Sequence, residues 1–405
     1  MLDFRNLSAV YQDSLLGSLV PFWLRHSTDE RCGGYFNNLT DDGQPIESDK
    51  SVEQQARHTW AYAGLYNALG GSNAWLEHAH RGASFLYQFG HDETLRCYAT
   101  VDRRGRPVAP TTDVCTDAAV VSAYCQMHRA TGNDEWAMLA KQTLASLLQR
   151  REQRRAALSR TIDGYRQLLH LSEPVAVMQA LLEAKPLLNE EDWKDAVKAL
   201  LDELLDEFLD KRQDILREWI QPEGAFLNTP EGRRLSPGLT FRAAATLHDL
   251  ASETGNRKVA LQVANWTIRL CEWAWDDAVG GLDLWVDIKT QPLPYPDWKQ
   301  RWAPVHLDCL AALTKAYFYT RHPDAPKWLG RVHNYTIEHF PDTQHGGWHL
   351  ALNRQGKPLF PAKSTLTCGA GDLIKPLLDA WHMTEQCAKM QPLGSFGRGM
   401  RVGGM

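Results

Sequence analysis

The feature that most constrains this chain is an internal repeat of about 62 residues. Three segments share a pattern in which the first glycine of a Gly-Gly pair precedes a proline by twelve positions. They are Gly33 to Pro45, Gly280 to Pro292 and Gly346 to Pro358. A fourth segment, Cys97 to Pro107, keeps only the end of this pattern. Because apolar residues alternate around a polar turn, each segment predicts a short β-hairpin.

A second motif predicts tight turns between helices. Glycine is followed by Ser, Asn or Asp at three places, which lie near residues 70–73, 131–133 and 254–256. Glycine commonly ends a helix, and Ser, Asn or Asp commonly caps the next one. The spacing from Gly71 to Gly132 is 61 residues, and that from Gly132 to Gly255 is 123, about twice as long. A unit of this size fits six times into 405 residues, so we expect six helical hairpins.

Hydrophobic periodicity independently predicts twelve helices. Their expected ranges are 5–25, 51–69, 73–90, 113–130, 134–152, 171–187, 190–212, 239–253, 257–275, 303–320, 325–339 and 370–387. Open solenoids usually have short connections, whereas several connections here are long and contain hairpins. We therefore expect an all-α fold, an (α/α)6 barrel of about twelve helices with short β-hairpins in the loops at one mouth.

Composition limits the domain organisation and the partners. No linker rich in Gly, Ser or Pro divides residues 1–390, so we expect one barrel domain; residues 391–405 contain five glycines and predict a flexible tail. The net charge of −5 without a basic run argues against nucleic acid, and no apolar stretch could span a bilayer. The eight scattered cysteines and the lack of a signal-peptide pattern predict a cytoplasmic protein with reduced thiols and no metal site.

Candidate functional residues lie where the barrel mouth is expected. Aromatic side chains beside the hairpins could stack on a sugar ring, although aromatics at helical spacing usually belong to the core. Arg57, flanked by Ala56 and Trp60, is costly to bury unpaired, so it should meet an acid or line a polar cavity. Two pairs, His170 with Glu173 and His306 with Asp308, could transfer protons or form structural hydrogen bonds.

Several motifs together resemble the N-acylglucosamine 2-epimerase family, which includes mannose isomerase-like and cellobiose 2-epimerase-like enzymes, over roughly residues 10–385. They are Gly33-Gly34-Tyr35-Phe36, Asp49-Lys50, Gln55-Ala56-Arg57, the stretch 232–238, His306-Leu307-Asp308 and the stretch 347–357. The resemblance implies an (α/α)6 barrel and cofactor-free proton transfer at C2 of an open-chain sugar. Return of the proton to the opposite face of C2 gives epimerisation, and return to C1 gives aldose–ketose isomerisation.

The resemblance also implies residue roles. Arg57 would stabilise the enediolate oxygen. The expected catalytic residues are Arg57, His170, His306, Asp308 and Asp372, and the expected substrate-binding residues are Tyr35, Gln55, Trp60, Glu173, Trp302 and Trp348. The expected partner is a small-molecule sugar, without cofactor, metal, nucleic acid or membrane; a homodimer remains open.

Two family positions differ in this chain. The family reads Pro-Gly-His with Glu three residues later, but here Pro237-Gly238 is followed by Leu239, and Arg242 stands at the glutamate position. A second family histidine should fall near residues 371–375, where Asp372 or Lys375 could replace it. Each general acid or base typically contributes ~10²–10⁴-fold to the rate, so both losses bear on activity.

Four functional hypotheses follow. The first is a sugar 2-epimerase or isomerase whose acid/base groups come from His170, His306 and Asp372. The second is a catalytically silent sugar-binding paralogue. The third is a glycoside hydrolase, which needs two carboxylates about 5–9.5 Å apart, with Glu173, Asp308 and Asp372 as candidates. The fourth is a purely structural helical protein.

Overall fold

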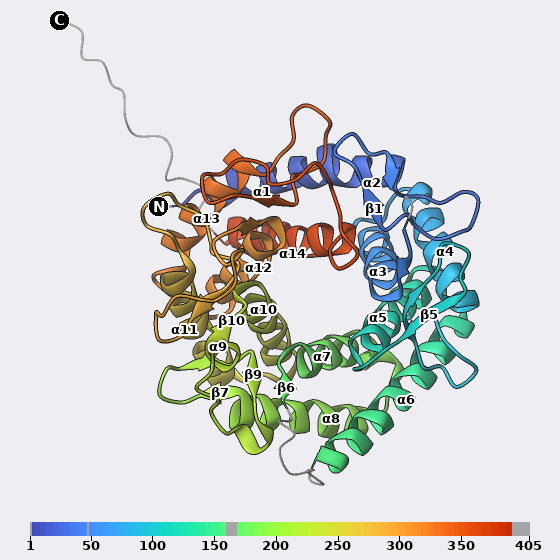
Figure 1. The fold of residues 1–405 in the computed structure, drawn as a ribbon, viewed down its shortest axis with the longest axis horizontal. Helices are drawn as coiled ribbons and strands as arrows, with labels where there is room; N and C mark the ends of the chain where they lie inside the picture. The colour runs from blue at the N-terminus through green and yellow to red at the C-terminus, as the bar shows by residue number, and fades with distance from the viewer. Residues whose placement is uncertain (1, 47, 159–167, 391–405) are drawn as a thin grey trace, which may run out of the picture.

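The computed structural model describes residues 2–46, 48–158 and 168–390, and these form two concentric rings of helices (Figure 1). The expected tail, 391–405, lies outside the described residues. The inner ring consists of α3 (Val52–Leu69), α5 (Cys115–Thr131), α7 (Ser172–Ala184), α10 (Pro237–Thr254), α12 (Ala303–Thr320) and α14 (Ala370–Lys389). Each inner helix contacts the next, and α14 contacts α3, so the ring is closed.

The outer ring supplies one partner for each inner helix. Five outer helices are α4 (Asn73–Phe89), α6 (Asp134–Leu158), α8 (Glu190–Glu203), α11 (Arg257–Ala274) and α13 (Ala325–His339). The sixth outer element is continuous and comprises α1 (Phe4–Asp13), the π-helix η1 (Ser14–Leu19) and α2 (Val20–His26); it packs on α14. The predicted (α/α)6 barrel is confirmed, and the observed helices begin and end close to the expected ranges. Within the described residues, no helix combines the length and apolar character needed to cross a membrane.

Short turns join each inner helix to its outer partner. Gly70, Gly132 and Gly255 end three inner helices in the left-handed conformation, with φ values of 65°, 65° and 67°. Glycine adopts this conformation without a Cβ clash, which explains the repeated motif. The side chains of Ser72 and Asn256 cap the helices that follow.

The long connections lead from an outer helix to the next inner helix, so their strands gather at the N-terminal ends of the inner helices. This end of the barrel is the mouth. Smaller helical turns in these connections and between helices are η2 (Lys185–Leu187), η3 (Leu204–Phe208), η4 (Pro222–Gly224) and α9 (Pro230–Arg233). The mouth also contains two strand pairs from one connection and its neighbour, β6 (Leu169–His170) with β9 (Trp219–Ile220) and β7 (Leu209–Asp210) with β8 (Ile215–Leu216).

Two of the four expected hairpins form as predicted. β1 (Asn38–Leu39) pairs with β2 (Pro45–Ile46), and β4 (Tyr98–Val101) pairs with β5 (Pro107–Pro110); β3 (Lys50–Ser51) adds to the edge of β4. The prediction for Gly280 to Pro292 was wrong, because β11 (Val286–Asp287) pairs with the distant β10 (Arg234–Leu235). In the last repeat β13 (Ala351–Leu352) pairs with β12 (Arg301–Trp302), and only a single bridge joins Leu352 to Pro358.

The Gly-Gly pairs build a loop that sequence comparison did not reveal. In each of three loops an aspartate lies four residues before the first glycine: Asp29, Asp276 and Asp342. Its backbone N–H donates to the carbonyl of the second glycine, at 3.0 Å in all three loops. Its carboxylate pairs with a cation from a later segment, such as Lys50, Arg301 or Lys363. The repeated motif is therefore an aspartate-anchored turn that attaches each connection to the barrel.

Candidate active site

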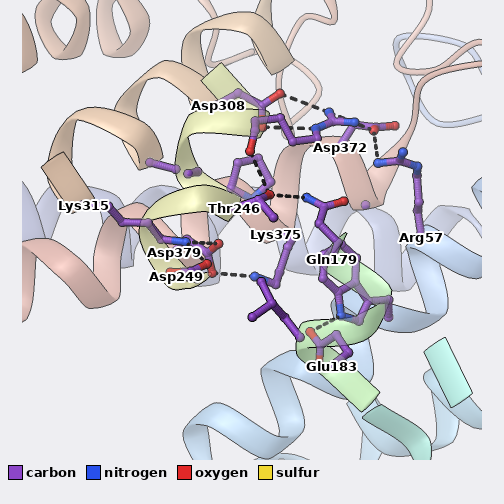
Figure 2. Close-up of a pocket in the computed structure, with 17 residues that line it drawn as sticks. Arg57, Gln179, Glu183, Thr246, Asp249, Asp308, Lys315, Asp372, Lys375 and Asp379 are labelled. Carbon is purple, nitrogen blue, oxygen red and sulfur yellow. Dashed lines mark hydrogen bonds and ion pairs between the residues drawn. The ribbon is translucent and has the colours of Figure 1, made fainter. Parts of the chain in front are cut away.

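Three inner helices carry charged residues seven positions apart. These pairs are Arg242 and Asp249 on α10, Asp308 and Lys315 on α12, and Asp372 and Asp379 on α14. Seven residues are about two helical turns, so both members of a pair lie on one face. All six line one pocket inside the inner ring, which Figure 2 shows. Because 66 and 64 residues separate the first members, the three helices present equivalent positions of consecutive repeats.

The layer of the pocket nearer the mouth is a chain of ion pairs across four helices. Arg57 Nη1 lies 3.3 Å from Asp372 Oδ1, and Arg57 Nη2 lies 2.8 Å from Glu53 Oε1. Arg242 Nη2 lies 3.4 Å from Asp372 Oδ1 and 3.1 Å from Asp308 Oδ2. The backbone N–H of Gly369 donates to the other oxygen of Asp372, which fixes this carboxylate at the start of α14.

The environment of this layer shifts the pKa of Asp308 toward neutrality. Burial raises the pKa of the Asp308 carboxyl to about 6, and the neighbouring charge of Asp372 adds to this effect. The guanidinium of Arg242 opposes the rise but does not cancel it. Burial would lower the pKa of Arg57, but the charges of Glu53 and Asp372 hold it above its usual value. Asp308 can therefore exchange a proton near neutral pH beside fixed positive charges, as general acid/base catalysis requires.

A second charged layer lies about two turns deeper. Lys315 Nζ lies 2.6 Å from Asp249 Oδ2 and 3.3 Å from Asp379 Oδ2. Lys375 Nζ lies 2.6 Å from Asp379 and 4.9 Å from the centre of the Trp60 ring. These contacts join the same three helices, α10, α12 and α14, that carry the upper layer. The lower layer therefore holds these helices in register beneath Arg242, Asp308 and Asp372.

The polar lining continues onto α7. The indole N–H of Trp60 donates to Glu183 at 2.8 Å, and the amide of Gln179 donates to the Thr246 hydroxyl at 3.1 Å. Figure 2 shows Gln179 and Glu183 on the side of the pocket away from Lys315.

Close packing fixes Arg57 in this arrangement. Gly371, the second residue of α14, has no side chain, and a Cβ there would lie 2.5 Å from the carbonyl oxygen of Arg57. This distance is shorter than real Cβ contacts allow, so α14 can approach α3 this closely only with glycine. The Arg57–Asp372 pair consequently depends on a residue that itself carries no chemistry.

Four of the residues expected from sequence line the pocket: Arg57, Trp60, Asp308 and Asp372. His170 lies at the mouth, where its Nδ1 is 2.6 Å from the Ser172 hydroxyl and its Nε2 is 3.4 Å from Glu218 Oε1. Its side chain is 29% exposed, so it can be reached from solvent. It does not line the described pocket.

Glu173 and His306 occupy other surroundings. Glu173 forms ion pairs with Arg151 and Arg154 of α6, whereas His170 is held by Ser172 and Glu218. His306 is fully buried, and both of its ring nitrogens are in use. Its Nε2 accepts the Leu282 N–H at 2.9 Å, and its Nδ1 donates to the Trp302 carbonyl at 2.8 Å. Burial lowers the pKa of His306 to about 3, so this neutral ring secures the loop above α12.

The residues beside the Gly-Gly motifs also point away from the pocket. Tyr35 is buried between α3 and α4, and its hydroxyl donates to the His78 carbonyl at 2.6 Å. The side-chain amide of Gln55 accepts a hydrogen bond from the Tyr35 N–H and donates one to the Tyr35 carbonyl. Trp348 is buried and packs against Phe340. Trp302 lies at the mouth on β12, where its N–H donates to Gln300.

Sequence reasoning did not assign a site role to Arg242, Lys315, Asp249 or Asp379. Their signal is the repeat itself, because charged residues recur at equivalent positions of consecutive inner helices. Leu239 is the third residue of α10, and its side chain is half-buried. Within the described ranges, no cluster of three or more His, Cys, Asp and Glu side chains is arranged to hold a metal ion.

Comparisons with known proteins agree with this architecture. The family model for N-acylglucosamine 2-epimerase matches residues 34–368. The N-acylglucosamine 2-epimerase of Rattus norvegicus is 26% identical over 354 residues, which cover 84% of this chain and 83% of the relative. The Homo sapiens enzyme of the same name is 26% identical over 356 residues, covering 84% and 82%.

Two solved structures share the fold. Cellobiose 2-epimerase from Bacillus thermoamylovorans B4167 superimposes with a TM-score of 0.80 at 18% identity, covering 93% of this chain and 99% of that one. A D-mannose isomerase gives a TM-score of 0.78 at 16% identity, covering 92% and 97%. Since the family model spans most of the chain, the chain belongs to the N-acylglucosamine 2-epimerase family.

Proposed function

We propose that this protein is a sugar 2-epimerase or aldose–ketose isomerase that acts by proton transfer at C2 of an open-chain sugar. The observation that carries the proposal is the upper layer, in which Asp308 and Asp372 share Arg242 beside Arg57. The names of the similar proteins, N-acylglucosamine 2-epimerase, cellobiose 2-epimerase and D-mannose isomerase, support a sugar as the substrate.

In the proposed reaction a carboxylate replaces the missing family histidine as base. Asp308, with its pKa near 6, removes the proton from C2, and the C–H bonding electrons form the C1–C2 double bond of an enediolate. The negative charge develops on the C1 oxygen, where Arg57 and Arg242 stabilise it. Asp372, after it takes up a proton from solvent, donates this proton to the other face of C2, which gives the epimer. Donation to C1 instead, with the C2 hydroxyl proton passing to the C1 oxygen, gives the ketose.

Asp308 and Asp372 lie close enough to act on one substrate, because both approach one guanidinium. The same Nη2 atom of Arg242 contacts an oxygen of each, so the two oxygens can be no further apart than the sum of these two contacts. Two carboxylates in one site commonly differ in proton affinity, which separates an acid from a base. His170 remains a candidate for proton exchange at the mouth, whereas His306 is enclosed by Leu282 and Trp302.

Two observations favour a second candidate, a catalytically silent sugar-binding protein. Leu239 stands where the family has a histidine, and leucine exchanges no proton. In addition, both carboxylates of the upper layer are engaged in ion pairs. Under this hypothesis the pocket binds a sugar without turnover.

The deciding experiment is proton–deuterium exchange at C2. The full chain is incubated in D₂O with mannose, glucose, N-acetylglucosamine, N-acetylmannosamine and cellobiose, and exchange is followed by NMR. We expect exchange with at least one sugar, a loss of about 10²-fold or more in Asp308→Asn and in Arg57→Met, and full activity in Arg331→Met, whose side chain pairs with Asp277 on the exterior.

The remaining outcomes separate the alternatives. Calorimetric binding of a sugar without exchange contradicts the enzyme and supports the silent binder. Hydrolysis of an aryl glycoside that requires Asp308 and Asp372 would instead support a glycoside hydrolase. Neither binding nor turnover with the whole panel, in a folded sample, rejects both sugar hypotheses for these substrates.

A further inference from the structure

A second hollow lies on the outside of the ring, away from the pocket. It is an open groove of about 790 Å³ between the outer face of α4, the loop that follows α2, and the turn between β4 and β5. Figure 1 shows α4 and β5 on the outer edge of the barrel. The groove is lined by Arg31, Cys32, Gly33, His80, Arg81, Ser84, Phe85, Gln88, Phe89, Arg103 and Arg104. Four of these residues are arginines and none carries a carboxylate.

The charge of this groove is opposite to that of the whole chain. The protein has a net charge of −5, yet three separate segments each direct arginines into one hollow. Glu30, on the rim, pairs with Arg81 at 2.7 Å, but among the described residues Arg31 and Arg104 have neither an ion pair nor a side-chain hydrogen bond. Arg81 is paired with Glu30, Arg103 with Asp29, and the carboxylate of Asp102 lies near Arg104. The lining itself still carries an excess of positive charge gathered from three segments, which is typical of a site for an anion.

A buried carboxylate beneath the groove fixes one of its walls. Asp29 is 1% exposed and accepts hydrogen bonds from the backbone N–H groups of Arg31 and Cys32, both at 3.2 Å. The same carboxylate holds Arg103 at 2.9 Å and Lys50 at 3.1 Å. Burial alone would raise the pKa of Asp29, but the hydrogen bond from Arg103 and the charge of Lys50 bring it down to about 2. The loop and the Arg103 guanidinium are thus held in place before any ligand arrives.

The floor of the groove is aromatic. Phe85 and Phe89 lie with their ring centres 5.2 Å apart, and the Lys50 ammonium lies 4.6 Å from the centre of the Phe85 ring. Ser84 and Gln88 add neutral hydrogen-bonding groups on the same face of α4. Phe85 is 2% exposed, so this aromatic pair forms a packed base beneath the guanidinium groups.

We infer that this groove is a binding site for a small molecule that carries phosphate groups. Arginine recognises phosphate through two parallel N–H donors, and its guanidinium is more weakly hydrated than an ammonium. The volume lies within the range of small-ligand sites, which favours a small molecule over an extended acidic peptide.

The groove is also connected to the inner ring. Lys50 donates to the carbonyl of Gly33 in the groove wall at 2.5 Å and belongs to β3, which leads directly into α3 and Arg57. One short segment, β3, therefore connects the wall of the groove to the helix that bears Arg57.

The test uses the full chain and inorganic pyrophosphate as the probe, with binding measured by isothermal titration calorimetry at low ionic strength. We expect saturable binding that weakens at least about tenfold in the double variant Arg31→Ala/Arg104→Ala. Gln88→Glu, which places a carboxylate in the lining without removing an arginine, should weaken binding similarly. The matched control is Arg5→Ala/Arg257→Ala, which changes net charge equally at two exposed residues elsewhere.

Each result of these titrations either supports or overturns the proposed phosphate site. Loss of binding in both groove variants, with an unchanged control, supports the site. Equal weakening in the groove and control variants overturns it, because binding then reflects overall charge alone. No binding to the wild-type chain overturns it, and so does tighter binding of a poly-glutamate peptide than of pyrophosphate, which would assign the groove to an acidic protein partner. None of these results depends on sugar turnover.

Discussion

Replacing Asp308 by asparagine should change how the stability of this protein depends on pH. The pKa of Asp308 rises from 3.8 in an exposed carboxyl to about 6 in the folded chain, with burial as the main cause. A difference of about two pKa units corresponds to about 3 kcal/mol, because each unit is worth about 1.4 kcal/mol. The folded state therefore binds a proton at Asp308 that the unfolded state has released in the pH range between these two values.

The sign follows from this proton. Asp308 contributes most to stability below about pH 4, and this contribution is lost as the pH rises through about 6. Asparagine has no such dependence. The unfolding free energy of the wild type minus that of Asp308→Asn should thus fall by about 3 kcal/mol between pH 4 and pH 7.5.

The assay is urea unfolding followed by the fluorescence of the 15 tryptophans at several pH values. Asp277→Asn controls for the loss of one carboxylate, because that side chain is 88% exposed. Infrared difference spectra between the wild type and Asp308→Asn should also show a protonated carboxyl band that titrates near pH 6. A free-energy difference that stays constant with pH, or one that grows as pH rises, would refute the reasoning about burial.

Three further predictions concern the supports of the site. Gly371→Ala should cost about 1–3 kcal/mol and lower any activity that needs Arg57, because its Cβ would meet the Arg57 backbone; thermal unfolding and the exchange assay measure both. Arg301→Met should cost about 3–5 kcal/mol in urea unfolding, since it leaves Asp283 buried without its ion pair and Asp276 with Arg354 alone. Lys315→Met should cost a similar amount at pH 7.5 but less at pH 5, where the two facing carboxylates it leaves can take up a proton.

The ring could be predicted from sequence because it rests on local signals. Helical periodicity and the turn glycines Gly70, Gly132 and Gly255 act within a few residues of themselves, and the repeat fixes how many times they recur. The pairing of β11 with β10 could not be predicted in the same way. That contact joins residues about 50 positions apart, and two-residue strands carry little pattern of their own.

The site was predicted in part, for a physical reason that differs between residues. Arg57 stood out because an arginine among apolar neighbours needs a partner, and Asp372 is that partner. Arg242 was treated as a lost glutamate, although its position 66 residues before Asp308 makes it the counter-charge of that carboxylate. Tyr35 was expected at the mouth because it follows a Gly-Gly pair.

Tyr35 faces the layer between the rings because the aspartate-anchored loop turns the chain inward. Asp29 holds the loop through its backbone and side chain, and Gln55 then clamps Tyr35 against α3. The glycines of this loop are evident in the sequence, but the aspartate four residues before them determines the direction of the chain. A search for aspartate at that offset would have identified all three loops as structural.

The contact between the segment Phe4–His26 and α14 has a consequence for the order of folding. Every other inner helix finds its outer partner within the next few tens of residues, whereas α14 packs against a segment made about 350 residues earlier. During synthesis the apolar face of this first segment, which contains Phe4, Leu7 and Tyr11, has to wait until α14 is made before it can pack against it. Contacts of such long sequence separation form slowly, so closing the ring should be the last and slowest step of folding.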